Sequence, residues 1–375
     1  MDLTLLALIL ALAFANGTND VSKAIATLVG SGVTNYPTAI LWGTVWTMAG
    51  AGLSALVATA MVKTFSTGLV QPDLIIPPVF ALTVLGGAMT WVLLASRTGL
   101  PVSTTHALTG AMIGAGVMAF GQEGLVWPAL AKKIALPLLL SPLLACTVAV
   151  MIHPLIHALA TRWEGHCLCV MPTARALVTI DAHGTTRTLF QSTSLGRPVL
   201  AVPSQCDRAG LKGLVVGLDS IHWISSGLAS LARGTNDAPK IVAMLLLGHS
   251  LTTPADSALR TAVFSGVTIA MGVGSYWGGL RVTQVLAEKV TRMNHVEGLS
   301  ANLTTSSLVM ISAMLGLPVS TTHVSSSSII GIGLLKGLQA VRWTTVRDMA
   351  LAWIVTIPVA ALLACLGYLL LIRIL

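Results

Sequence analysis

The chain of 375 residues is 54% hydrophobic and only 9% charged, and its mean hydropathy is +0.85. Soluble domains carry about 25% charged residues, so this composition excludes an ordinary soluble enzyme and predicts an all-α polytopic membrane protein. The net charge of +8 is then a matter of membrane topology rather than of nucleic-acid binding. The five cysteines are scattered and odd in number, and they predict no disulfide framework.

In chain order, the first apolar run covers residues 3–15, which is too short to cross a bilayer, so we expect this span to continue through the polar motif that follows. A second span is expected at 37–62. The runs at 79–98 and 102–120 are separated by only three residues, and they predict a re-entrant hairpin whose tip reaches the protein interior. A span at 127–152 completes the first unit.

The segment 153–213 has no long apolar run, and we expect it to be a hydrophilic cytoplasmic loop. It separates two transmembrane repeats, 1–152 and 214–375. The second repeat is expected to follow the same plan, with spans within 214–248, at 257–285 and at 344–372 and a hairpin at 297–335.

Two motifs are written twice in the chain. Asn16–Ala26 (NGTNDVSKAIA) is similar to Arg233–Ala243 (RGTNDAPKIVA), and GLPVSTTH at Gly99–His106 returns unchanged at Gly316–His323. Both pairs are offset by 217 residues, so the chain is a tandem duplication of one unit. Because the first motif belongs to this repeat, we expect the apolar run before it to stay in the protein rather than to act as a signal peptide.

The duplicated units are expected to be inverted relative to each other. Gly17 in the first copy, and Gly234 with Pro239 in the second, predict a broken helix in each unit. Each unit crosses the membrane three times if its hairpin is re-entrant and five times if it spans. Either number is odd, so the second copy enters the membrane from the opposite side and is inverted. Inverted repeats with a site near the midplane are the layout of secondary transporters.

The positions of Lys and Arg predict the orientation. With both termini outside and the central loop in the cytoplasm, 12 of the 21 basic residues lie inside and five lie outside. The other four lie in or beside the motifs. We therefore expect both termini on the outer side of the cell (inner) membrane.

The hairpin tips carry the chemistry of an oxyanion site. A Ser-Thr-Thr sequence after a proline, at the start of a helix, offers hydroxyls, free N–H groups and the positive end of the helix dipole. Two facing sets would surround a small tetrahedral anion, and the asparagines of the GTND motifs would add amide donors. The alternative is that the hydroxyls bond to carbonyls of their own helices. The two sets are Ser103, Thr104 and Thr105, and Ser320, Thr321 and Thr322.

Asp20 and Asp237 repel an anion, and an aspartate at the bilayer centre costs about 2.5–3.5 kcal/mol on insertion scales. We expect them, with the asparagines beside them, to hold a coupling cation, Na⁺ or H⁺. The alternative is a structural ion pair with the lysine three residues later, Lys23 or Lys240. Both interpretations, the cation site and the ion pair, hold if each lysine tunes the affinity of its carboxylate for a cation.

His106 and His323 each follow a serine by three residues, the serine being one member of a Ser-Thr-Thr set. No third group that would orient a catalytic histidine is evident, so we expect each histidine to be hydrogen-bonded at its helix start rather than to activate a nucleophile.

GTND followed by PVSTTH, both duplicated across a polar loop, resembles the PiT family of inorganic phosphate transporters, whose pattern is close to GANDVANAFGT in the first copy and GANDAQKTMG in the second. The resemblance covers nearly the whole chain except the central loop. It implies inverted repeats, external termini, phosphate symport with Na⁺ or H⁺ and often a homodimer. By resemblance, the site residues would be Asn19, Asp20, Asn236 and Asp237, with Ser103, Thr104, Thr105, Ser320, Thr321 and Thr322 on the hairpin tips.

Three residues depart from the family pattern. Lys23 stands where the family usually has Asn, Arg233 replaces a frequent His, and Asn302 falls where many members carry a Glu. An added positive charge and a missing acid both bear on cation handling. For Lys23 two interpretations stay open: a tethered cation beside Asp20 that replaces one mobile ion, or a lysine that snorkels to the headgroups.

The sequence therefore predicts a phosphate symporter that catalyses no bond chemistry and needs no cofactor beyond its coupling ion. One alternative is a permease for sulfate or another tetrahedral oxyanion. Sulfate has no proton to donate at neutral pH, so acidic residues at the cage favour phosphate. The other alternative is a membrane phosphate sensor that uses the central loop as its signalling surface.

Overall fold

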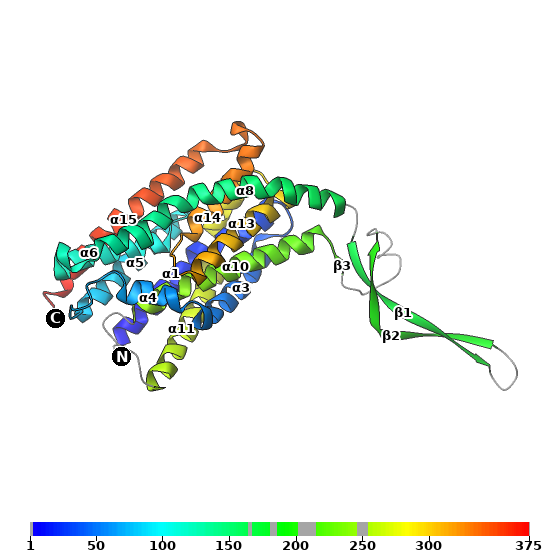
Figure 1. The fold of residues 1–375 in the computed structure, drawn as a ribbon, viewed down its shortest axis with the longest axis horizontal. Helices are drawn as coiled ribbons and strands as arrows, with labels where there is room; N and C mark the ends of the chain where they lie inside the picture. The colour runs from blue at the N-terminus through cyan, green and yellow to red at the C-terminus, as the bar shows by residue number, and fades with distance from the viewer. Residues whose placement is uncertain (1–2, 164–166, 181–185, 202–214, 246–253, 375) are drawn as a thin grey trace.

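The computed structural model describes residues 3–163, 167–180, 186–201, 215–245 and 254–374, and long helices packed side by side dominate it (Figure 1). The helices of the first half are α1 (Leu3–Asp20), α2 (Ser22–Gly30), α3 (Tyr36–Val57), α4 (Thr59–Thr67), α5 (Pro78–Thr98), α6 (Thr104–Phe120), α7 (Trp127–Ala129) and α8 (Leu136–Trp163). Those of the second half are α10 (Leu218–Ala243), α11 (Pro254–Gly278), α12 (Leu280–Glu288), α13 (His295–Met314), α14 (Thr321–Leu335) and α15 (Trp343–Leu371).

Within the described residues, six helical segments are long and apolar enough to cross a membrane. Large apolar side chains on the outer helices are exposed, such as Leu143 on α8 and Ile354 on α15, about 70% in each case. Polar residues gather instead in the interior, which is the distribution expected for a protein surrounded by lipid. The chain is a multi-pass helical membrane protein. The six segments are Leu3–Gly30, Tyr36–Val57, Pro78–Thr98, Trp127–Arg162, Ser257–Gly278 and Trp343–Leu371.

The two halves pack on each other reciprocally. α1 packs on α11 while α10 packs on α3, and α6 packs on α15 while α14 packs on α8. Two glycines related by the 217-residue repeat allow close contact of α6 with α15 and of α14 with α8. A Cβ on Gly114 would lie 2.2 Å from the Ala361 carbonyl oxygen, and a Cβ on Gly331 would lie 2.7 Å from the Cys146 carbonyl oxygen. Small residues let helix backbones approach in this way. The sequence repeat is therefore also a repeat of packing.

The broken helices are the main error of the sequence prediction. α1 runs through Gly17, and Val21, the one residue between α1 and α2, has helical backbone angles (φ −56°, ψ −33°). α10 continues through both Gly234 and Pro239. The break predicted in the second half is wrong, and in the first half it is reduced to one irregular turn.

Close helix contact explains why these positions are glycine. A Cβ on Gly17 would lie 2.2 Å from the Met271 carbonyl oxygen on α11, and one on Gly234 would lie 2.2 Å from the Thr47 carbonyl oxygen on α3. The motif glycines thus bring α1 and α10 against the opposite half. Proline within a membrane helix is tolerated where neighbouring groups satisfy the freed backbone carbonyl.

Other boundaries also differ from the prediction. The expected span at 37–62 is divided at Ala58 into α3 and α4, and the one at 257–285 is divided at Gly279 into α11 and α12. The last helix of the first half starts with a π-helical turn at Leu130–Ala135 and runs to Trp163 instead of ending at 152. The end of the span expected within 214–248 lies outside the described residues.

The central segment contains a β-hairpin that the sequence did not predict. β1 (Cys167–Ile180) pairs antiparallel with β2 (Thr186–Ala201), and β3 (Val215–Val216) pairs with the other edge of β1. The hairpin extends away from the helices (Figure 1). Residues 202–214 of the expected loop lie outside the described part of the chain.

Candidate functional site

The Ser-Thr-Thr tips of the two hairpins meet inside the protein, as the sequence predicted. The Thr322 hydroxyl donates to the Val102 carbonyl at 2.7 Å, and the Thr105 hydroxyl donates to the Val319 carbonyl at 3.5 Å. Val102 and Val319 are equivalent residues of the repeat. Each tip therefore binds the backbone of the other in the same way, and all six tip hydroxyl residues are buried.

The tip serines act as helix caps. Ser103 precedes α6 and accepts a hydrogen bond from the N–H of His106 at 3.2 Å, and Ser320 does the same at 3.1 Å for His323 at the start of α14. This is the local bonding that serine favours before a helix. The positive φ of Gly99 (79°) and Gly316 (67°) turns the chain at the end of the preceding helix. The expected helix-start geometry is confirmed.

Caps leave the first N–H groups of each helix available. Among the described residues, no hydrogen-bond acceptor is found for the backbone N–H of Thr104, Thr105, Thr321 or Thr322. Two helix N-termini with free donors therefore lie together at the centre of the molecule.

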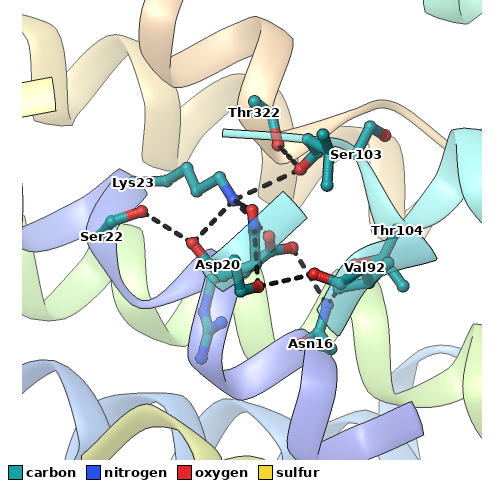
Figure 2. A network of polar contacts seen from close by, with 12 residues as sticks. Asn16, Asp20, Ser22, Lys23, Val92, Ser103, Thr104 and Thr322 are labelled. Atoms are coloured by element: carbon teal, nitrogen blue, oxygen red, sulfur yellow. Dashed lines mark hydrogen bonds and ion pairs between the residues drawn. The ribbon is translucent and has the colours of Figure 1, made fainter. Parts of the chain in front are cut away.

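Asp20 and Lys23 form a buried ion pair beside the first tip (Figure 2). The Lys23 ammonium also donates to the Asn19 carbonyl at 2.9 Å, to the Asn19 side-chain oxygen at 2.5 Å and to the Val102 carbonyl at 3.4 Å. Both ionised side chains are about 1% exposed. The interpretation of Lys23 as a snorkelling lysine is wrong, because its charge lies in the interior.

The second half repeats this pair. The Lys240 ammonium contacts Asp237 at 3.1 Å, and it donates to the Thr105 hydroxyl at 2.7 Å and the Val319 carbonyl at 3.3 Å. Both lysines thus join a motif carboxylate to a hairpin tip. The ion pairs weighed as an alternative in the sequence are present in both halves.

Asn16 is a site residue that sequence reasoning missed. Its amide nitrogen lies 3.0 Å from Asp20 and 3.0 Å from the Thr104 hydroxyl (Figure 2). It also lies 3.2 Å from Asp237. One side chain therefore connects both motif aspartates with the first tip. The available signal was its place in the repeated motif, four residues before Asp20, but no pattern indicates contacts across 88 and 221 residues.

The motif asparagines have different partners. The Asn19 amide donates to the Ser96 hydroxyl at 3.1 Å and the Leu100 carbonyl at 3.0 Å, which ties α1 to the end of α5. The Asn236 amide donates to Asp237 at 2.9 Å and the Val319 carbonyl at 3.3 Å. The side-chain oxygens of Asn16 and Asn236 are buried without a partner among the described residues. They are oxygen ligands that a hard cation such as Na⁺ prefers.

Arg233 occupies in the second motif the place that Asn16 has in the first, and it is about 1% exposed. The charged residues of the two motifs are then Lys23, Lys240 and Arg233 against Asp20 and Asp237. All five are buried, and with every group ionised their charges leave one positive charge in excess. A net positive interior with free N–H donors suits an anion.

Three further residues noted in the sequence are buried. The rings of His106 and His323 are 4.5 Å apart between the tips, and His323 faces the Leu138 carbonyl at 3.1 Å, so neither is arranged with a serine for nucleophilic chemistry. Asn302 is buried on α13, and its amide nitrogen has no partner within the described residues. In the same residues no group of three or more His, Cys, Asp or Glu could hold a metal ion.

Comparison with known proteins gives one consistent result. The model of the phosphate transporter family matches residues 16–364. A probable low-affinity inorganic phosphate transporter of Bacillus subtilis is 29% identical, covering 98% of this chain and 96% of that protein. A probable low-affinity inorganic phosphate transporter of Mycobacterium leprae is also 29% identical, and the match covers 96% of this chain and 75% of that protein. A solved structure titled as a sodium-dependent phosphate transporter shares the fold, with TM-score 0.74, 20% identity and 99% coverage of both chains. The chain belongs to the phosphate transporter family, and it is a transporter rather than an enzyme.

Proposed function

We propose that the protein is a secondary active symporter that carries inorganic phosphate together with a cation, Na⁺ or H⁺, through a buried site between its two halves. The observation that carries the proposal is the meeting of two hairpin tips, with free helix N-terminal donors, beside two buried aspartates. Phosphate needs several donors, and a cation needs carboxylate or amide oxygens. Both sets lie in one place.

The phosphate would be held by the tips. The proposed ligands are the N–H groups and hydroxyls of Thr104, Thr105, Thr321 and Thr322, with Asn19 and Asn236 at the edge and Ser103 and Ser320 as the caps that orient the helix starts. Two of these hydroxyls, those of Thr105 and Thr322, bond the opposite tip in this structure. Phosphate would replace those bonds and pull the tips around itself. Asp20 and Asp237 would accept a hydrogen bond from a protonated phosphate oxygen.

The coupling cation would bind at Asp20 and Asp237, with Asn19 and Asn236. In each carboxylate the lysine contacts one oxygen and the Asn16 amide contacts the other. Lys23 and Lys240 would tune the affinity, since a fixed positive charge beside a carboxylate weakens its attraction for a mobile cation.

The reciprocal packing of the two halves supports a two-fold relation between them, and we propose that the repeats are inverted in the membrane. Rocking of one half against the other would then expose the site alternately to each side. The distribution of Lys and Arg favours both termini outside a cell (inner) membrane and the β-hairpin segment in the cytoplasm. We further propose that the protein acts as a homodimer in the bilayer.

Transport of radiolabelled phosphate into liposomes containing the purified protein tests this function. We expect accumulation above equilibrium when an inward Na⁺ or H⁺ gradient is applied, and none without a gradient. Excess unlabelled sulfate should leave the uptake intact. Equal competition by sulfate would instead indicate a general oxyanion permease, and phosphate binding without any uptake would indicate a sensor.

A further inference from the structure

Arg233 is a buried cation without a carboxylate of its own. Its side chain is about 1% exposed, and its Nη2 atom donates to the Thr47 hydroxyl at 2.7 Å and the Ser275 hydroxyl at 3.3 Å. Its Nε and Nη1 atoms have no hydrogen-bond partner among the described residues. Thr47 lies on α3 and Ser275 on α11, so helices from both halves hold one side of the guanidinium and leave the remaining donors free.

Neighbouring carboxylates do not satisfy this charge. Asp20 pairs with Lys23 and Asp237 pairs with Lys240, and within the described chain no acidic oxygen lies within 4.0 Å of Arg233. A guanidinium stays protonated in proteins, so it cannot escape burial by losing its charge. Burying an ion without a partner is costly, and unpaired donors add to that cost. The missing partner has the chemistry of an oxyanion, since guanidinium donors match phosphate and carboxylate oxygens.

The place of Arg233 in the repeat indicates where that anion would lie. Arg233 precedes Asp237 by four residues on α10, as Asn16 precedes Asp20 on α1. From its position Asn16 contacts both motif aspartates and the Thr104 hydroxyl at the tip. The equivalent position in the second half is therefore within the same polar centre.

We propose that Arg233 binds the transported phosphate directly, through the N–H groups of its free Nε and Nη1 atoms. This inference rests on the function proposed above and adds a specific anion ligand to it. Thr47 and Ser275 hold the guanidinium in place, so that less side-chain entropy is lost when the anion binds. The opposing interpretation is a structural one, in which Arg233 only offsets the two carboxylates.

Calorimetric titration of the detergent-purified full chain with inorganic phosphate, together with melting curves at several phosphate concentrations, separates the two interpretations. We expect Arg233→Gln to raise the phosphate Kd at least about tenfold, as for loss of hydrogen bonds to a charged ligand, and to reduce the phosphate-induced rise in Tm. A structural role would lower the Tm without phosphate but leave the phosphate-induced rise intact. That result would overturn the proposal.

Arg260→Gln is the matched control, because Arg260 on α11 bonds the Ala55 carbonyl at 3.3 Å and lies outside the motifs. It should bind phosphate like the wild type. If Arg233→Gln does not fold, Arg233→Lys is the second variant, because it keeps the charge but loses the fixed donors. We expect a higher phosphate Kd in this variant, and an unchanged Kd would overturn direct binding. If the wild type itself neither binds nor transports phosphate, the proposed function fails together with this inference. If the wild type binds phosphate and the Arg233 variants bind it equally tightly, only the inference fails.

Discussion

Single residues set the charge of the buried centre. Lys23 and Lys240 each contact a motif aspartate and a backbone carbonyl of a hairpin tip, Val102 or Val319. The oxygens around each ammonium resemble the ligands of an alkali cation. Replacing either lysine therefore changes the cation chemistry of the site more than its packing.

Lys23→Asn is expected to increase the number of cations carried with each phosphate, because the Asp20 carboxylate then needs a mobile counter-ion. Removing one partner of a buried ion pair costs about 3–5 kcal/mol when nothing replaces it, so the variant should also gain stability from Na⁺ if Na⁺ is the coupling ion. The cation-to-phosphate ratio measured by isotope fluxes in liposomes checks this. An unchanged ratio would leave Lys23 with a structural role only.

Thr104→Val tests the tip as a phosphate ligand, since valine keeps the shape and removes the hydroxyl. We expect phosphate binding to weaken by about 1.5–3 kcal/mol, more than tenfold, and the same for Thr321→Val. Thr109→Val is the control, because that hydroxyl bonds the Thr105 carbonyl of its own helix at 2.7 Å. Wild-type affinity in both tip variants, measured by calorimetry, would refute the assignment.

At the scale of helices, the sequence predicted the hairpins but not the continuity of the motif helices, which is complete in α10 and interrupted only at Val21 in the first half. A proline between two apolar runs specifies the hairpin tip locally, and the sequence predicted the helix start at each Ser-Thr-Thr set, while the capping by Ser103 and Ser320 was found in the structure. A glycine that permits a break is indistinguishable in sequence from one that permits close packing. Only the opposite helix, through the Met271 and Thr47 carbonyls, decides the role of Gly17 and Gly234.

Gly114→Ala is expected to destabilise the contact of α6 with α15. The new Cβ would lie 2.2 Å from the Ala361 carbonyl oxygen, a backbone atom that moves only with its helix. Overpacking of this kind costs about 1–3 kcal/mol. Gly86→Ala in α5 has no neighbour within 4 Å and should leave the Tm equal or higher. Equal melting temperatures of the two variants in detergent would contradict the close contact.

At the scale of the whole molecule, the 217-residue offset predicts two similar units, and the structure shows that each unit packs on the other. The membrane class and the meeting of the tips follow from composition and motif spacing. The contacts of Asn16, the anchoring of Arg233 and the β-hairpin do not, because they depend on residues far apart in the chain or on strand pairing without an apolar signal. The sequence predicts which residues are polar and buried, while the distances between them require the fold.

The central claim is that phosphate and its driving cation share this centre, and transport by Asp237→Asn tests it most directly. The variant and the wild type are reconstituted in liposomes, and two quantities are measured on each: phosphate accumulation driven by an inward Na⁺ or H⁺ gradient, and exchange of labelled for unlabelled phosphate without a gradient. We expect Asp237→Asn to lose accumulation while exchange continues, since the donors of the hairpin tips to the anion remain. Full gradient-driven accumulation by both Asp237→Asn and Asp20→Asn would contradict the claim and leave the aspartates as structural ion pairs.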